Sequence, residues 1–284
     1  MEELSKEIAA MLQLIDDPDE MVFQTVSERF IGYGDKVLIV LEEQYQYAED
    51  PMSKNRLKQI IDNIHVNVLS TSLIEWKKDS DSTILEPSLI ISSFIQKGKE
   101  SNMYLFELEK IRKSIWLELN EFLTPLEVVN IFNKIIFEHF KFQSIQADSK
   151  NTDFFSLFEL LEMKASNSFP IAALYLIMSE MLGLDLKPVD VLNQNLLCYT
   201  EEDNFVSDHL NGQILFFLDP QNGQVYTHGD IENYYKKIGH HYPIEQIKPT
   251  GNNDFLSRWL INYSKNLDKN SWMQDQVRLI AQQL

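Results

Sequence analysis

Short helical periods separated by polar breaks fill the first 65 residues. Apolar side chains recur every three or four positions over residues 4–15 and again over residues 57–64, which places each set on one face of a helix. Between them, Asp17 and Glu20 have the spacing of a capping box, so we expect a second helix to begin there. A third helix is predicted to end near residue 45. These four helices resemble helical-repeat hairpins, although they show no clean internal period.

Helical patterns resume after a polar segment at residues 79–82. We expect helices from Pro87, over residues 103–120, and from a capping box formed by Thr124 and Glu127, the last of them reaching about residue 139. Polar residues at 143–152 predict a loop, and residues 154–163 predict another helix.

The pattern changes after Lys187. Residues 189–199 are rich in Val and Leu and predict a strand, and a second strand is predicted at residues 214–218. Asn222-Gly223 is a strong turn signal that would pair this strand with residues 225–227. Helices are expected again over residues 254–267 and 270–284. The fold class is therefore α+β, predominantly α-helical, with a small antiparallel sheet.

Composition and charge narrow the possible partners and location. Nine Gly and nine Pro in 284 residues disfavour both an all-β and a disordered chain. The net charge of −18 repels nucleic acid and anionic membrane surfaces, so neither is expected as a partner. The longest apolar stretch, residues 169–184, is too short to span a bilayer and predicts a buried helix. A single cysteine and no secretory pattern at the start favour a cytoplasmic protein.

Common catalytic and metal-binding motifs are absent. The sequence has no Gly-rich phosphate loop, no paired-Cys or His-Glu-x-x-His metal spacing and no Gly-x-Ser-x-Gly elbow. His240 and His241 are adjacent on an expected loop and are interpreted as solvated, so no metal or cofactor is expected.

Cys198 has two interpretations. A lone cysteine with His209 eleven residues later could form a thiolate pair, but the apolar neighbours of Cys198 favour a buried core residue. Phe154, Phe155 and Phe158 likewise fit a core better than a pocket lining.

The order of several motifs resembles the SirB-type transglutaminase-like family. The similarity begins at Trp116-Leu117-Glu118-Leu119-Asn120 and continues through the capping box and Asn133. It includes residues 161–168 before the long apolar helix, Leu182-Gly183-Leu184 at its end, and Asp219-Pro220-Gln221-Asn222-Gly223. The opening helices are similar to the extension of the bacterial members, and the likeness extends to about Tyr235. The resemblance implies a papain-like domain behind an N-terminal helical region.

The resemblance also implies where catalytic residues would stand. In active transglutaminase-like enzymes a Cys at the start of the core helix attacks a carbonyl, a His activates it, and an Asp orients the His. Here these positions fall on Ser168, on Gln194 (or Asn195 with a register shift of one), and on Asp219. Neither amide can act as a base at useful pH. Asp219 without an imidazole to orient is expected to form a turn, and Asn167 with its serine neighbours to cap the helix.

We therefore expect a helical-repeat-like region at residues 1–78, a degenerate transglutaminase-like domain at 79–245, and C-terminal helices at 246–284. The expected function is that of a pseudoenzyme that binds or scaffolds an unknown protein or peptide, with basic segments favoured by the net charge. The expected binding residues are Asn167, Ser168, Gln194, Asn195 and Asp219. One alternative is an amide-bond transferase or hydrolase that uses Ser168 with Asp219 or Cys198 with His209. Another is a helical-repeat adaptor in which the second domain is inert.

Overall fold

The computed structural model describes residues 2–79, 83–145, 151–191, 194–201, 213–240, 247–269 and 271–284. The fold is predominantly helical with a small antiparallel sheet, so the expected fold class is confirmed. No helix within these ranges is long and apolar enough to cross a membrane.

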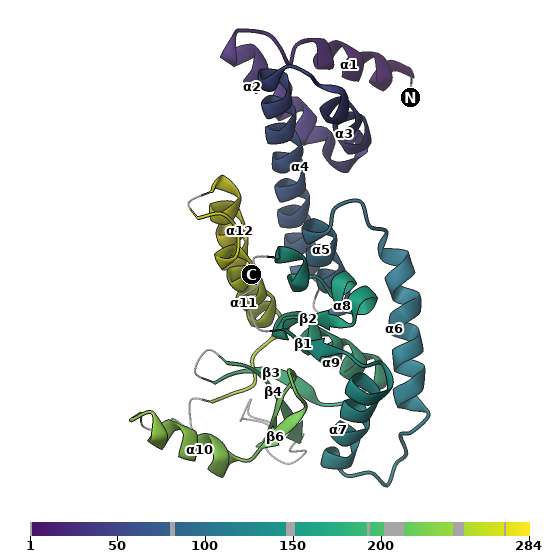
Figure 1. The fold of residues 1–284 in the computed structure, drawn as a ribbon, viewed down its shortest axis with the longest axis vertical. Helices are drawn as coiled ribbons and strands as arrows, with labels where there is room; N and C mark the ends of the chain where they lie inside the picture. Colours follow the sequence, from purple (N-terminus) through teal and green to yellow (C-terminus); the bar gives the residue numbers. More distant parts are fainter. Residues whose placement is uncertain are drawn as a thin grey trace.

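An N-terminal helical block packs against the first half of a long helix (Figure 1). It consists of α1 (Glu2–Gln13), α2 (Glu20–Tyr33), the 3₁₀ turn η1 (Gly34–Val37) and α3 (Leu38–Tyr47), and the long helix is α4 (Pro51–Lys77). Their shared apolar cluster includes Phe23, Phe30, Leu41, Ile60 and Ile64, of which Phe30, Leu41, Ile60 and Ile64 are completely buried.

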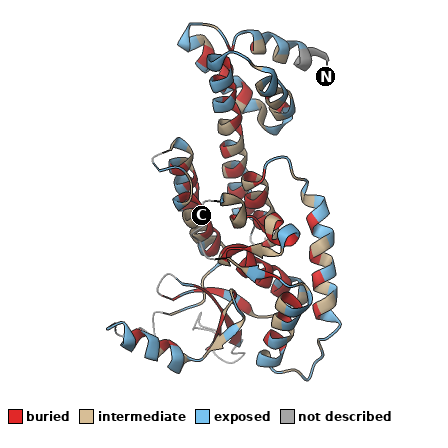
Figure 2. Ribbon diagram, in the orientation of Figure 1, coloured by how far each residue is buried: buried red, intermediate tan, exposed pale blue. Residues whose placement is uncertain are grey.

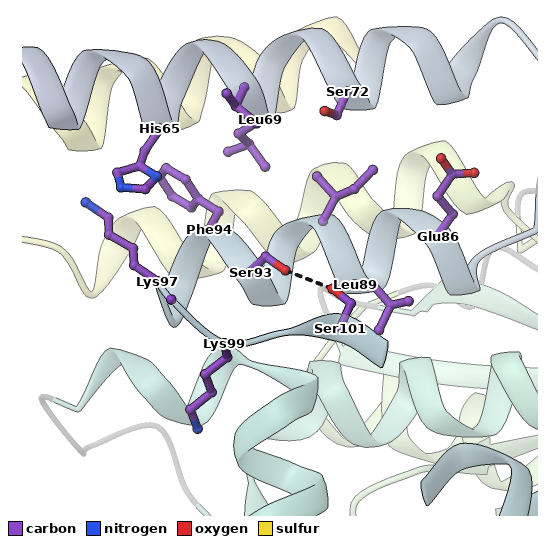
Figure 3. A pocket seen from close by; sticks show the side chains of 13 residues that line it. His65, Leu69, Ser72, Glu86, Leu89, Ser93, Phe94, Lys97, Lys99 and Ser101 are labelled. Atoms are coloured by element: carbon purple, nitrogen blue, oxygen red, sulfur yellow. Dashed lines mark hydrogen bonds between the residues drawn. The ribbon is translucent and has the colours of Figure 1, made fainter. Parts of the chain in front are cut away.

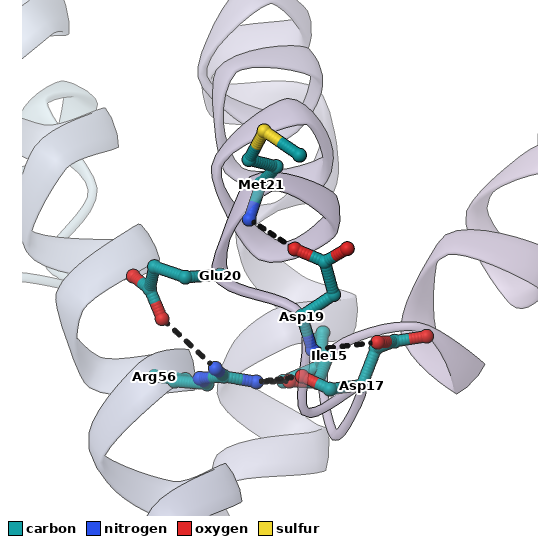
Figure 4. Close-up of polar contacts among 6 residues, drawn as sticks. All are labelled: Ile15, Asp17, Asp19, Glu20, Met21 and Arg56. Carbon is teal, nitrogen blue, oxygen red and sulfur yellow. Dashed lines mark hydrogen bonds and ion pairs between the residues drawn. The ribbon is translucent and has the colours of Figure 1, made fainter.

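Arg56 of α4 ties the loop between α1 and α2 to this block (Figure 4). Its Nη1 donates hydrogen bonds of 2.7 Å to the backbone carbonyl oxygens of both Ile15 and Asp17, and its Nη2 lies 3.1 Å from Glu20 Oε2. The guanidinium also stacks on the ring of Phe23, 4.4 Å from its centroid. Because this side chain is only 8% exposed and Ile15 is buried, the loop depends on Arg56 to satisfy the Ile15 carbonyl.

The second half of α4 belongs to a larger core built around α9 (Ser168–Leu182). Residues Phe169 to Ser179 of α9 are buried without interruption (Figure 2). Around α9 lie α5 (Leu85–Ile95), α6 (Ser101–Trp116), α7 (Pro125–Asn133) with its π-helical continuation η2 (Lys134–His139), α8 (Leu157–Met163), α11 (Asn252–Lys265) and α12 (Trp272–Gln283). The two cores meet within α4. The domain boundary expected after residue 78 lies just beyond the end of α4. The domain limits stay a prediction.

Four antiparallel strands form the main sheet, in the order β3 (Leu186–Val191), β4 (Gln194–Glu201), β5 (Gln213–Asp219) and β6 (Gln224–Tyr226). Alternate side chains face opposite sides. Leu197, Tyr199 and Leu218 join the core around α9, whereas Leu196, Cys198 and Phe217 pack against α10 (His228–Lys237). A separate parallel pair joins β1 (Gln143–Ser144) to β2 (Ala165–Ser166).

Four local predictions are wrong in detail. The loop predicted at residues 143–152 begins with the short strand β1. The apolar run at residues 189–199 does not form one strand but contributes to two, β3 and β4, which pair with each other. The side-chain cap of α2 is Asp19 rather than Asp17. The helix expected at residues 154–163 is divided, because Ser156 ends the 3₁₀ turn η3 (Thr152–Phe155) and caps α8. Phe155 and Phe158 are core residues, as predicted.

Candidate functional site

The amino end of α9 is the position at which the family resemblance predicts a nucleophile. Asn167 caps the helix, since its Oδ1 accepts a 2.9 Å hydrogen bond from the backbone N–H of Phe169. The predicted capping role of this segment is confirmed. Ser168 is half-buried, and its backbone carbonyl accepts a 3.3 Å hydrogen bond from Asn195 Nδ2. The structure therefore brings Ser168 next to Asn195.

Several buried polar groups on this face of the sheet lack hydrogen bonds among the described residues. They are Asn167 Nδ2, Asn195 Oδ1, and Nε and Nη2 of Arg258 in α11. Arg258 Nη1 lies 3.9 Å from Asp190 Oδ1, and Asp190 is the strand partner of Asn195. Burial lowers the pKa of Arg258. These groups form a polar region beside the helix end, but the four atoms are enclosed rather than open to solvent.

Gln194 and Asp219 lie on the other side of the sheet. They line a cavity of about 800 Å³ together with Leu196 and Val225 of the sheet and Asp230 and Tyr234 of α10. Asn167, Ser168 and Asn195 do not line this cavity. Successive residues of a strand face opposite sides, so Gln194 and Asn195 are separated by the sheet itself. The five expected binding residues therefore divide into two groups, and the structure does not bring Ser168, Gln194 and Asp219 into one cleft.

Asp219 ends β5 and organises the turn that follows. Its Oδ1 accepts a 2.9 Å hydrogen bond from the Gln221 N–H, and its backbone carbonyl accepts one of 2.8 Å from Gly223. The expected turn role is confirmed. Burial raises the pKa of the Asp219 carboxyl, while hydrogen bonds from Gln221 and Asn222 act in the opposite direction.

A buried network fixes this turn to the helices. Tyr175 of α9 donates a 2.6 Å hydrogen bond to Asn133 Oδ1, and Asn133 Nδ2 donates one of 2.7 Å to the Gly223 carbonyl. Gly223 has φ 74°, and a Cβ there would lie 2.7 Å from the Asn133 side chain. Burial and the Asp219 charge raise the pKa of Tyr175 well above its ordinary value. No local pattern in the sequence indicated that Asn133 would reach residues 42 and 90 positions away.

Cys198 is completely buried in β4 on the α10 side of the sheet. Burial raises the pKa of its thiol to about 12, with a smaller opposing effect from Lys187. Such a thiol is almost fully protonated at neutral pH, which does not support a nucleophilic role. The partner suggested for it, His209, lies outside the described residues, as does His241. The described residues contain no cluster of three His, Cys, Asp or Glu side chains suited to a metal ion.

Comparisons with known proteins give one match. The model of a family described as the transglutaminase-like superfamily matches residues 102–261, which include α9, the four-stranded sheet and most of α11. No curated protein matches the chain. No solved structure matches it either.

Proposed function

The chain belongs to the transglutaminase-like superfamily, and from this membership we propose that it binds an extended peptide without catalysing acyl transfer. The observation that carries the proposal is the separation of residues at the expected catalytic positions. Ser168 contacts Asn195 on one side of the sheet, while Gln194 and Asp219 face a cavity on the other.

The residues at the amino end of α9 support a loss of chemistry. A serine hydroxyl needs a base within hydrogen-bond reach to become a useful nucleophile. The side chain that bonds the backbone carbonyl of Ser168 is the amide of Asn195, which has no proton-accepting group at useful pH. Asp219 has a raised pKa, but it lines the cavity from which Ser168 is absent.

The cavity beside α10 supports peptide binding. Its wall includes Gln224, Val225 and Tyr226, which make up β6, and β6 is an edge strand of the sheet. An extended peptide can pair with such an edge through its backbone, while its side chains enter the adjoining cavity. Asp219 and Asp230 contribute two carboxylates against the single ammonium of Lys237, so a basic peptide side chain is favoured.

We further propose that the chain is of the SirB type. The features that support this are the segment at residues 161–168 and the Asp219-to-Gly223 turn, both in the family's order. A cytoplasmic location and a bacterial source also stay proposals.

A peptide library with fixed positions tests the binding proposal. Fluorescence anisotropy should select extended peptides that carry Lys or Arg. Asp219→Asn removes a cavity charge and should weaken the selected peptide about tenfold, the size expected for a hydrogen bond to a charged group. Lys237→Met removes the opposing charge and should strengthen binding.

Asp35→Asn is the matched control, because Asp35 is exposed in η1, outside the cavity. It should bind like the unmodified protein. If the peptide binds the Asp219→Asn and Lys237→Met variants with the same affinity as the unmodified protein, the binding site lies elsewhere and the proposal is refuted.

A further inference from the structure

A second cavity lies between α4, α5 and the beginning of α6 (Figure 3). Its volume is about 440 Å³, within the roughly 300–1,000 Å³ typical of ligand sites. The residues that line it run from His65 to Ser101, so all of them precede the segment that the family model matches. Membership of the superfamily therefore assigns no role to this cavity.

The cavity has an apolar middle and oppositely charged ends. Leu69 of α4 and Leu89 and Phe94 of α5 supply the apolar part. Figure 3 shows His65 and Lys97 together at one end and Glu86 at the other. Glu86 lies in the first turn of α5 and Lys97 lies two residues beyond its end, and the nine helical steps from Glu86 to Ile95 alone span about 14 Å at 1.5 Å per residue.

At the end formed by Lys97 and His65, the charge in the lining of the cavity is the ammonium of Lys97. Lys97 Nζ lies 3.0 Å from Asp62 Oδ1, an ion pair at the protein surface that leaves other ammonium hydrogens available. The His65 side chain is 12% exposed, and its Nε2, 3.6 Å from Glu42 Oε1, makes no hydrogen bond among the described residues. Burial and then the Lys97 charge lower the pKa of His65 to about 4, while Asp62 acts in the opposite direction. The imidazole is therefore neutral at pH 7.

The geometry points to a binding site for a short apolar peptide whose ammonium end lies beside Glu86 and whose carboxylate end lies beside Lys97 and His65. An extended chain spans about 3.3 Å per residue, so a span of at least about 14 Å accommodates about four or five residues. A fatty acid has a carboxylate that can pair with Lys97, but it has no ammonium that can pair with Glu86. The two charged ends therefore favour a zwitterionic ligand.

Calorimetric titration of the full chain with the pentapeptide ALVLA tests this site. The peptide is used with free ends, with an acetylated amino end, and with an amidated carboxyl end. Free ends should bind most tightly, and each modification should weaken binding about tenfold, as expected for the loss of a charged hydrogen bond. No binding up to millimolar peptide, or equal binding of all three forms, would overturn the proposal.

Variants locate the two ends. Lys97→Met should weaken the free peptide about tenfold but leave the amidated peptide unchanged, because that peptide has no carboxylate to lose. Glu86→Gln should weaken the free peptide about tenfold but leave the acetylated peptide unchanged, because that peptide has no ammonium to lose. Lys113→Met, on the exposed side of α6, is the matched control and should change nothing.

An NMR titration of His65 provides an independent measurement. Binding of the free peptide should raise its pKa from about 4, since a nearby carboxylate stabilises the imidazolium, and the amidated peptide should not. Peptide binding lost in Asp219→Asn but retained in Lys97→Met would assign the peptide to the cavity beside α10 and overturn the proposal. This pattern leaves the proposed function intact, so the two proposals fail separately.

Discussion

Asn133 connects the Asp219 turn to the helical core, and its removal should destabilise the protein measurably. Asn133→Ala deletes both the 2.6 Å hydrogen bond from Tyr175 and the 2.7 Å hydrogen bond to the Gly223 carbonyl. Two such bonds contribute about 2 kcal/mol together, and Tyr175, which has no exposed surface, would keep an unsatisfied hydroxyl at a cost of about 1 kcal/mol or more. The better helix propensity of alanine offsets about 0.5 kcal/mol. We expect a net loss of about 2–3 kcal/mol.

Asn130→Ala is the matched control because Asn130 is exposed on the same helix, α7. It gains the same helix propensity but loses no buried hydrogen bond. Urea unfolding followed by circular dichroism at 222 nm measures both variants. A difference below about 1 kcal/mol between them would refute the reasoning.

A double-mutant cycle separates the hydrogen bond from general packing. Tyr175→Phe removes the hydroxyl but keeps the buried ring. If the two side chains act through their hydrogen bond, Asn133→Ala should cost at least about 1 kcal/mol less in the Tyr175→Phe background. Simple addition of the two effects would contradict the network.

Three further predictions concern other parts of the chain. Arg56→Met should destabilise the N-terminal block by about 3 kcal/mol and speed hydrogen exchange in α1 and α2, because it removes the hydrogen bonds to two backbone carbonyls and leaves the buried one of Ile15 unsatisfied. The exposed ion-pair variant Arg29→Met should stay within about 0.5 kcal/mol of wild type, and equal effects of the two variants would contradict this role. Cys198 should react with iodoacetamide at least about a hundredfold more slowly in the folded protein than in urea, since burial raises its pKa to about 12; equal rates would refute this. Because burial raises the pKa of Asp219, the folded state binds more protons just above pH 3.8, and stability falls as pH rises through that window. The Asp219→Asn variant has no carboxyl to titrate at this position. Its stability relative to wild type should therefore improve from about pH 3 to about pH 7, and a relative decline in urea titrations would contradict the raised pKa of Asp219.

Features that depend on neighbouring residues could be predicted from the sequence. The capping box of Thr124 and Glu127 and the turn at Asn222-Gly223 both form as expected, because each is decided within a few residues. The run at residues 189–199 predicts one strand but contributes to two. It contains no Gly or Pro to mark the reversal between β3 and β4, and its only turn-forming residues are Asp190, Asn193 and Asn195.

The candidate site could be predicted only in part. The order of motifs pointed to Ser168, Gln194 or Asn195, and Asp219, but it could not decide which strand residues share a face. A shift of one position moves a side chain to the opposite side of a sheet, and this difference separates Gln194 from Asn195. Residues such as Asn133 and Tyr234 reach their positions through long-range packing, which leaves no local signal in the sequence.

Mass spectrometry of protein and peptide after prolonged incubation tests the central claim most directly. A basic peptide selected by the library is mixed with stoichiometric full-length protein at neutral pH. If the transglutaminase-like domain binds without chemistry, both molecules should be recovered at their original masses. A cleaved or transferred peptide, or an acyl adduct on Ser168 or Cys198, would contradict the account.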